Sequence, residues 1–174
     1  SYRIGIELEN LIKISDLFSI QTNMTLSSNK NKNIFSMLDG KLFNYGETNI
    51  SFSPSFIASN SIIYNPSDKM SFSFLSKYVG KQYMGNTDQP NSVLESYFVN
   101  DLNISYLLEP KKTFQSISIN LLINNILNKE YLSNGYYYTY DDTWSVPGQT
   151  TTLDGAGYYP QATRNFLAGL VFEF

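Results

Sequence analysis

The chain has 174 residues, a formal net charge of −3, and an unusual abundance of aromatic residues, with 14 Tyr and 12 Phe. Only 16% of its residues are charged, against roughly a quarter in ordinary soluble domains. It contains no Cys and no His, which excludes a disulfide framework, a thiolate metal site and the commonest general base. This composition suits a sheet that has one face in lipid and the other in a wet lumen.

Apolar and polar residues alternate along seven successive segments of the chain. In the first segment, for example, Ile4, Ile6 and Leu8 are apolar and the positions between them are Gly or polar. Because successive side chains of a strand point to opposite faces, each segment predicts a strand with one apolar face and one polar face. The seven predicted strands are residues 2–14, 18–27, 50–64, 70–78, 98–108, 116–124 and 165–174.

The predicted strands are joined alternately by short and long connections. The short ones, residues 15–16, 65–69 and 109–113, carry the Pro, Asp and Asn of tight turns. The long ones are residues 28–48, 80–94 and about 135–160, with Asp39-Gly40 predicted as a turn inside the first. Short periplasmic turns that alternate with long external loops are typical of outer-membrane barrels. The last strand would then run downward and place Phe174 at the periplasmic side.

A soluble β-sandwich such as a lectin is the alternative, since its strands also alternate. The predicted strands are longer than the roughly 5 to 6 residues of soluble strands and suit the roughly 9 to 11 of membrane strands. Their polar face carries Ser and Asn more than Lys and Glu, which favours a lumen over bulk solvent. We therefore predict an all-β fold, a transmembrane antiparallel up-and-down β-barrel segment of about seven strands, without a second domain.

Targeting segments give one further expectation. No apolar run approaches the roughly 18 residues of a transmembrane helix. The chain opens on Ser1-Tyr2-Arg3, already in the alternating pattern and without a secretion leader. Because an outer-membrane protein must be exported, we expect this chain to be part of a longer one.

Several short segments form a recognisable series along the chain. They are Gly5-Ile6-Glu7-Leu8, Phe52-Ser53-Pro54, Ala58-Ser59-Asn60, Tyr64-Asn65-Pro66, residues 77–87, residues 124–131 and residues 159–166, followed by the terminal Phe174. In their order and spacing these segments resemble TonB-dependent outer-membrane receptors of the Bacteroidetes type. Two positions depart from that pattern: Thr163, where a Gly usually precedes the Arg, and Leu167, where a polar residue is more usual.

This resemblance implies more than the pattern does. It implies that residues 1–174 are the C-terminal portion of a probable 22-stranded barrel, whose N-terminal strands and plug are absent. It implies as partners the outer-membrane lipid, the remaining strands and plug, TonB through the absent N-terminal part, and the barrel-assembly machinery. The signal for that machinery would include Gly169, Phe172 and Phe174.

Two groups of side chains are candidate functional residues. One group is lumen-facing and either contacts a plug or substrate, or pairs across the barrel wall, which we favour. The other lies in the predicted external loop and either captures a ligand or forms an aromatic girdle at the membrane interface. The lumen-facing residues are Arg3, Glu7, Glu9, Lys77 and Asp101, and the loop residues are Tyr140, Asp141, Asp142, Trp144, Tyr158 and Tyr159.

The function expected from the resemblance is import of a scarce, bulky nutrient, such as a siderophore, haem, cobalamin, an oligosaccharide or a peptide, across the outer membrane. The alternative is an outer-membrane fragment held as a folding client of the barrel-assembly machinery through its last strand. We expect no enzymatic activity, because nothing marks a nucleophile or a closed pocket. We also expect no cofactor and no nucleic-acid partner. Asp141 and Asp142 are only a weak indication of a Ca²⁺ site, so no metal is expected.

Overall fold

The chain forms almost entirely antiparallel β-structure in the computed structural model, which describes residues 1–110 and 114–174. Its one helical element among these residues is a 3-10 turn, η1 (Pro90–Ser92). No helix in the described ranges is long and apolar enough to cross a membrane. The strands are β1 (Tyr2–Lys13), β2 (Phe18–Leu38), β3 (Lys41–Asn49), β4 (Phe56–Ser67), β5 (Met70–Val79), β6 (Gln82–Tyr83), β7 (Val93–Leu94), β8 (Tyr97–Leu108), β9 (Ser116–Asn124), β10 (Leu132–Asp142), β11 (Thr151–Pro160) and β12 (Asn165–Glu173).

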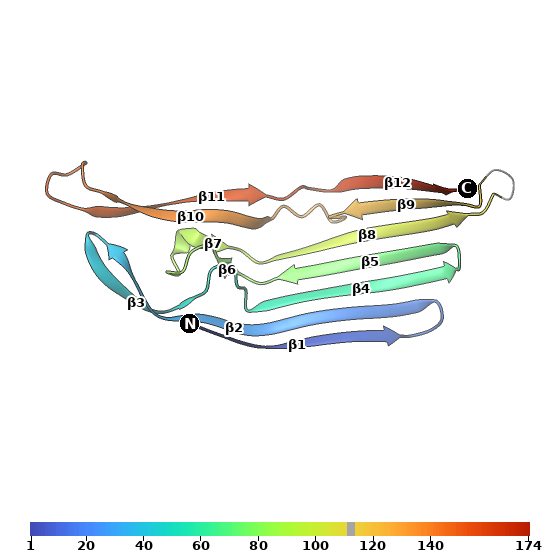
Figure 1. Cartoon of the computed structure of the whole chain (residues 1–174), viewed down its shortest axis with the longest axis horizontal. Coiled ribbons are helices and arrows are strands. Elements are labelled where there is room, and N and C mark those ends of the chain that lie inside the picture. Colours follow the sequence, from blue (N-terminus) through green and yellow to red (C-terminus); the bar gives the residue numbers. More distant parts are fainter. Residues whose placement is uncertain (111–113) are drawn as a thin grey trace.

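One sheet carries all seven predicted strands, in the order β1-β2-β4-β5-β8-β9-β12. Each strand pairs antiparallel with the next one predicted along the chain, as expected of an up-and-down sheet. The short turns lie together at one end of the sheet, where the C-terminus also ends (Figure 1). We call this the turn end, and the opposite end the hairpin end.

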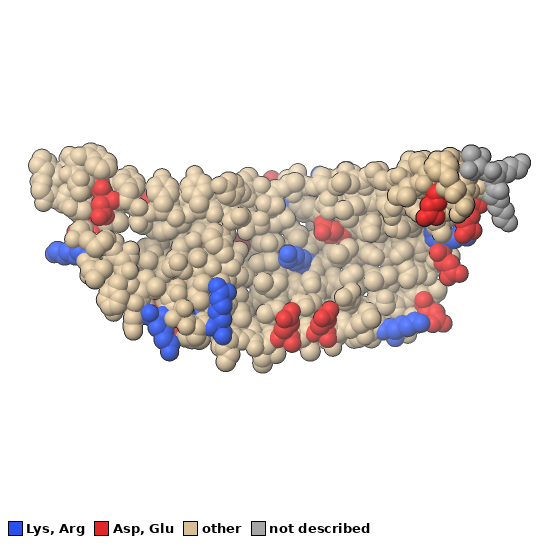
Figure 2. All heavy atoms as spheres, viewed as in Figure 1, with Lys and Arg blue, Asp and Glu red and all other residues tan. Residues whose placement is uncertain are grey.

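The register keeps apolar side chains on one face across the whole sheet. Ile6 lies beside Leu26, and Leu26 lies beside Phe56; at the other edge Leu121 lies between Ile104 and Ala168. Charged residues of the seven strands occupy the opposite face in the stretches that alternate. Figure 2 shows acidic and basic side chains over the middle of the face in view as well as near its ends.

Five adjacent strands interrupt this apolar face with one polar residue each. Thr22 donates a hydrogen bond to the Asn60 amide oxygen at 3.0 Å, and Ser76 donates to the Asn100 amide oxygen at 2.8 Å. Asn100 is only 2% exposed, and its amide nitrogen has no hydrogen-bond partner. The row consists of Asn10, Thr22, Asn60, Ser76 and Asn100, side by side in the register.

The long connections differ from the prediction because two of them are themselves hairpins. β2 continues past residue 27 and turns at Asp39-Gly40 into β3, with positive φ of 52° and 72° that a two-residue hairpin requires. β10 and β11 form a separate two-stranded hairpin, so residues 135–160 are not a loop. Both hairpins project beyond the hairpin end of β4 and β5 in Figure 1.

Two of the predicted boundaries were also wrong. Residues 50–55, read as the start of a strand, form a turn, in which Phe52 has a φ of 50° and donates its N–H to the Tyr83 carbonyl at 2.8 Å. The connection at 65–69 is shorter than expected, because β4 runs through Pro66 to Ser67 with a bulge. Of the predicted turn at 109–113, residues 111–113 lie outside the described residues.

Candidate functional site

The hairpin end holds a cavity of about 440 Å³ enclosed by three projecting segments. These are the β2–β3 hairpin, the segment that contains β6, η1 and β7, and the β10–β11 hairpin. We call it the hairpin cavity. Its walls are a mixture of amide, hydroxyl and aromatic groups, of which Tyr45, Asn91, Tyr137, Thr152 and Asp154 matter most below.

The tip of the β2–β3 hairpin is fastened to β11 by reciprocal hydrogen bonds. The backbone N–H of Asp39 donates to the Thr152 hydroxyl at 2.7 Å, and the N–H of Thr152 donates to the Asp39 carboxylate at 2.8 Å. The Thr152 hydroxyl in turn donates to Asp141 at 2.7 Å. Two segments more than one hundred residues apart thus form one wall of the cavity.

A second set of contacts joins η1 to the same hairpin. The Asn91 amide donates to Asp154 at 3.1 Å, and the Tyr158 hydroxyl donates to the Asn91 carbonyl at 3.1 Å. Burial raises the pKa of Tyr137 to about 12, and the charge of Asp154 and a hydrogen bond with it add to the effect. Tyr137 therefore stays a neutral phenol at every physiological pH.

The β2–β3 hairpin is also tied to the segment between β6 and η1. Asp88 accepts hydrogen bonds from the Asn49 backbone at 3.0 Å and from its amide at 2.8 Å. Thr48, only 3% exposed, donates to the Asn86 carbonyl at 2.7 Å. Each hydrogen bond of this network contributes a net stabilisation of about 1 kcal/mol. Together these bonds hold the three segments in one ordered assembly.

The predicted loop residues separate onto the two faces of the β10–β11 hairpin. Tyr158 lies on the same face as Tyr137 and reaches η1, whereas Tyr140, Trp144 and Tyr159 belong to the opposite, outward face. Of the six candidates, Asp141 and Tyr158 therefore make contacts on the cavity side. Capture of a ligand by these six residues stays a prediction.

Asp141 and Asp142 also point to opposite faces, being consecutive on a strand. Asp142 accepts hydrogen bonds from the backbone N–H groups of Trp144 and Ser145 at 3.1 and 3.0 Å. A side-chain hydrogen bond from Ser145, together with these N–H groups, lowers the Asp142 pKa below its ordinary value. Its role is to shape the hairpin tip, and its divergence from Asp141 argues against a shared cation.

The predicted lumen-facing charges share the polar face of the sheet, but they are not paired. None of Arg3, Glu7, Glu9, Lys77 and Asp101 forms an ion pair within the described part of the chain, so charge pairing across the wall, the interpretation we favoured, is not observed. Glu7 instead accepts a hydrogen bond from the Asn23 amide at 3.3 Å, and Asp101 accepts the Asn125 N–H at 2.7 Å. Lys77 and Asp101 line a depression of about 280 Å³ on this face.

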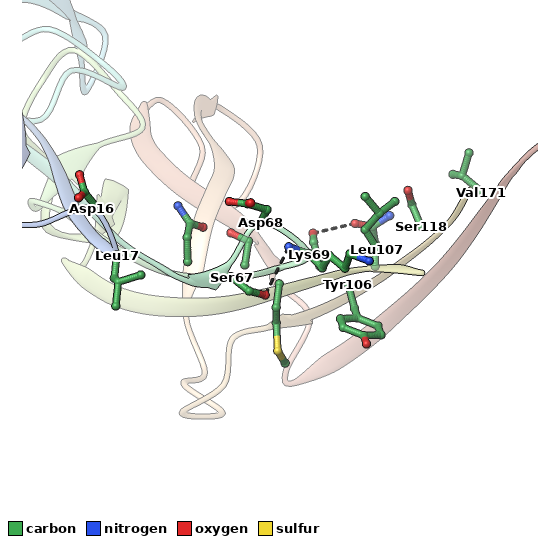
Figure 3. A pocket seen from close by; sticks show the side chains of 14 residues that line it. Asp16, Leu17, Ser67, Asp68, Lys69, Tyr106, Leu107, Ser118 and Val171 are labelled. Carbon is green, nitrogen blue, oxygen red and sulfur yellow. Dashed lines mark hydrogen bonds between the residues drawn. The ribbon is translucent and has the colours of Figure 1, made fainter. Parts of the chain in front are cut away.

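A larger depression, about 710 Å³, lies at the turn end of the same face. Figure 3 shows its labelled side chains coming from the short turns and from β8, β9 and β12. Lys69 reaches out of the second turn to Glu109 at 2.8 Å, and Ser105 donates to Asn120 at 2.8 Å. This depression is wide open, so it is part of the polar surface of the sheet and not an enclosed binding site.

Of the predicted assembly residues, Gly169 and Phe172 lie on β12 and Phe174 directly follows it, at an edge of the sheet that no other strand of the described residues covers. Gly169 has open space where a Cβ would be. Phe172 and Phe174 pack against Phe114 with ring centroids 5.3 and 5.0 Å apart, and Phe174 is still 83% exposed. Their use as a recognition signal stays a prediction.

Sequence reasoning missed the residues that hold the cavity together. Asp39 was read only as a turn residue, and Asn91 and Thr152 were not singled out. The only local indication was Tyr137 and Asp154 in an aromatic, acidic segment. Their contacts cross between hairpins, so no spacing along the chain could have revealed them.

Comparison with solved structures identifies the fold. No family model and no curated protein matches the sequence. The siderophore receptor PiuA from Acinetobacter baumannii matches 97% of this chain with a TM-score of 0.65 at 19% identity. The ferric-catecholate import receptor Fiu from E. coli, in its closed form, matches 95% with a TM-score of 0.64 at 16% identity. The ferric yersiniabactin uptake receptor FyuA from Yersinia pestis matches 99% with a TM-score of 0.59 at 14% identity.

The fold is that of a TonB-dependent receptor barrel wall. The sheet, in which β3 beside β2 is the eighth strand, thus has the fold of a segment of a transmembrane antiparallel barrel, as the alternation predicted. The chain covers 21%, 20% and 23% of these three receptors, so it spans about one fifth of their length. The matches establish the fold and do not test the Bacteroidetes type.

Proposed function

We propose that this chain is the C-terminal part of an outer-membrane TonB-dependent receptor that imports a scarce, bulky nutrient. One observation carries the proposal: the hairpin cavity is built by three interlocked segments on a barrel wall that matches siderophore and ferric-complex receptors along almost its whole length. The match to proteins named as receptors also agrees with a role in transport rather than catalysis.

The chemistry of the cavity favours a large ligand bound by many weak contacts. Amide, hydroxyl and phenol groups from three segments converge there, and Tyr137 offers a neutral phenol beside the Asp154 carboxylate. Such groups orient a ligand by hydrogen bonds, while the aromatic rings supply contact area. A ferric siderophore is the class we favour, because the matched receptors are named for iron complexes.

The rest of the mechanism lies in parts of the receptor that this chain does not supply. The remaining strands would close the barrel, because an open sheet edge in lipid leaves backbone groups unsatisfied. A plug would fill the lumen against the polar face that carries Lys77 and Asp101, and TonB would deliver energy through that plug. The exposed edge of β12 and its terminal Phe174 would be the part recognised by the barrel-assembly machinery.

The test is iron uptake by the intact receptor in cells that lack other siderophore receptors. Radiolabelled ferric siderophores of the catecholate, hydroxamate and citrate classes would be supplied one at a time. Asn91→Ala should reduce uptake of the preferred siderophore, because it releases η1 from Asp154 and opens the cavity. Tyr140→Phe, on the opposite face of the hairpin and outside the cavity lining, is the control variant.

Two outcomes would contradict the proposal. One is that the intact receptor, inserted at normal level, takes up none of these iron complexes. The other is that Asn91→Ala leaves uptake unchanged while Tyr140→Phe abolishes it, which would place the site on the opposite face of the hairpin.

A further inference from the structure

Five aromatic rings form a continuous strip on the outward face of the β10–β11 hairpin, which we call the aromatic ladder. Successive ring centroids from Tyr136 to Tyr138, Tyr138 to Tyr140 and Tyr140 to Trp144 are each 6.3 Å apart, with interplanar angles of 21°, 23° and 9°. Tyr159 adjoins Tyr136 at 6.1 Å. The four rings from Tyr136 to Trp144 are thus close to parallel, whereas Tyr159 is tilted by 52° against Tyr136. Each of the five residues is between 44% and 69% exposed.

The opposite strand is shaped to let these rings lie flat. Tyr136 lies across Gly157 and Tyr138 lies across Gly155 in the hairpin register. A Cβ at Gly157 would come within 2.4 Å of the Tyr136 ring, and one at Gly155 within 2.6 Å of the Tyr138 ring. Any other residue at these positions would lift the rings off the sheet. The arrangement of the ladder therefore depends on residues of both strands, and it is not a chance cluster of exposed aromatic side chains.

The ladder residues of β10 occupy the opposite parity to Tyr137, and of the five ladder residues only Tyr138 also borders the hairpin cavity. The ladder is also too long to be only an interfacial girdle. It extends for roughly 20 Å along β10 and its tip, whereas a girdle occupies one narrow band at the membrane surface. With strands tilted by roughly 40°, at most the base near Tyr136 lies in that band.

The charged residues of the β10–β11 hairpin narrow the chemical class of ligand that the aromatic ladder can bind. Residues 132–160 contain no Lys or Arg and carry Asp141, Asp142 and Asp154. Asp142 is the one of these carboxylates on the ladder face, and no cationic side chain accompanies it there. A phosphorylated or otherwise anionic ligand, or an anionic lipid headgroup, therefore has no cationic partner on the ladder. What remains is a neutral ligand with flat, weakly polar faces and hydroxyl groups at its edges.

We propose that the aromatic ladder binds a neutral saccharide chain. The C–H faces of pyranose rings carry slight positive charge and pack on the negative faces of aromatic rings. The hydroxyls of Tyr136 and Tyr138 reach across the ladder to the glycines of β11. A tyrosine hydroxyl can both donate and accept, so it can exchange hydrogen bonds with sugar hydroxyls. The regular spacing lets successive sugar units of one chain contact successive rings. The chain can come from the neutral polysaccharide of the surrounding outer leaflet or from a free polysaccharide.

The experiment uses the intact receptor in detergent and measures its retardation in native gels that contain a neutral polysaccharide. Separate gels contain dextran, soluble starch, galactomannan or xyloglucan. Lipid nanodiscs with neutral smooth lipopolysaccharide, or with lipopolysaccharide that lacks the polysaccharide, distinguish the two sources. Tyr140→Ala and Trp144→Ala remove rings, Gly157→Ala tilts Tyr136 while keeping every ring, and Tyr137→Phe is the control on the cavity face.

We expect retardation by at least one polysaccharide, or binding to smooth but not truncated lipopolysaccharide. Tyr140→Ala and Trp144→Ala should each weaken this binding by about tenfold, Tyr140→Phe by much less, and Tyr137→Phe not at all. Gly157→Ala should also weaken saccharide binding. Because this variant keeps every ring and changes only the tilt of Tyr136, weaker binding would show that the arrangement of the rings matters. Binding to none of the polysaccharides or lipopolysaccharides, or equal binding by the ladder variants at normal heat-modifiability, would overturn the proposal. Iron uptake is measured separately, so a failure of the saccharide proposal would not contradict the proposed uptake of iron complexes through the hairpin cavity.

Discussion

Replacing Ile119 by Lys tests which face of β9 lies against lipid. Ile119 lies between Tyr106 of β8 and Leu170 of β12, and it is central among the apolar positions of its own strand. A Lys there would place its ammonium near the middle of the hydrocarbon. Lysine at the midplane of an outer-membrane barrel costs about 2–4 kcal/mol, and we expect Ile119→Lys to fall in that range.

The adjacent residue Ser118 provides the matched control, because it points to the other face of the same strand. It lies between Leu107 and Val171 and lines the open depression at the turn end. An ammonium there can reach water, so Ser118→Lys should cost less than about 0.5 kcal/mol. Asn120→Lys should cost about 1 kcal/mol, because it also loses the 2.8 Å hydrogen bond from Ser105.

The assay is urea unfolding of the intact receptor in phospholipid vesicles, followed by heat-modifiable gel mobility. The expected order of destabilisation is Ile119→Lys, then Asn120→Lys, then Ser118→Lys. If Ser118→Lys were the most damaging of the three, the face assignment would be reversed. Equal costs would mean that neither face of β9 contacts lipid.

Three other predictions follow from the contacts described above. Asp39→Ala should speed amide exchange at the β2–β3 tip by roughly fivefold, since it removes the acceptor for Thr152, while Asp39→Asn keeps both the acceptor and the positive φ. The pKa of Tyr137 is raised to about 12 from the 10.0 of an ordinary tyrosine, so the stability that its neutral form contributes is complete below pH 10 and lost between pH 10 and 12; spectrophotometric titration of Tyr137→Phe should lack the last tyrosinate step. Phe174→Ala should lower the inserted amount more than the stability of the inserted fraction, and normal levels with a weakened barrel would make Phe174 only an interface anchor.

The membrane strands could be predicted because one physical constraint dominates each of them. A strand with one face in lipid must alternate apolar and polar residues. Strands that follow one another along the chain usually pair directly, so the order and orientation of the strands follow from the local pattern. The prediction failed at residues 50–55, where the apolar parity continues although the backbone turns. Phe52 has a positive φ there, and alternation of residue type carries no information about φ.

The external segments were harder to predict because their stability comes from contacts between them. Residues 135–160 have no apolar face to repeat, and their tyrosines were read as loop or girdle. What makes β10 and β11 a hairpin is cross-strand fit, with Tyr136 and Tyr138 lying over Gly157 and Gly155. That fit was visible in the sequence only as unexplained glycines. The bonds from Asp39 and Asn91 to this hairpin depend on the tertiary arrangement alone.

The polar row on the lipid-facing side shows why register must be known before polarity can be interpreted. Taken strand by strand, Thr22, Asn60, Ser76 and Asn100 are isolated defects in an apolar face, each of which would cost several kcal/mol if unsatisfied in hydrocarbon. In the sheet they are neighbours, and the Thr22–Asn60 and Ser76–Asn100 bonds satisfy one group on each residue. Thr22 is directly opposite Asn60, and Ser76 is directly opposite Asn100. A hydrogen bond of this row is therefore lost if either of its two strands shifts its register by a single residue. The row therefore penalises misregistered pairing more than a uniformly apolar face would, and so contributes to specifying the register of these strands.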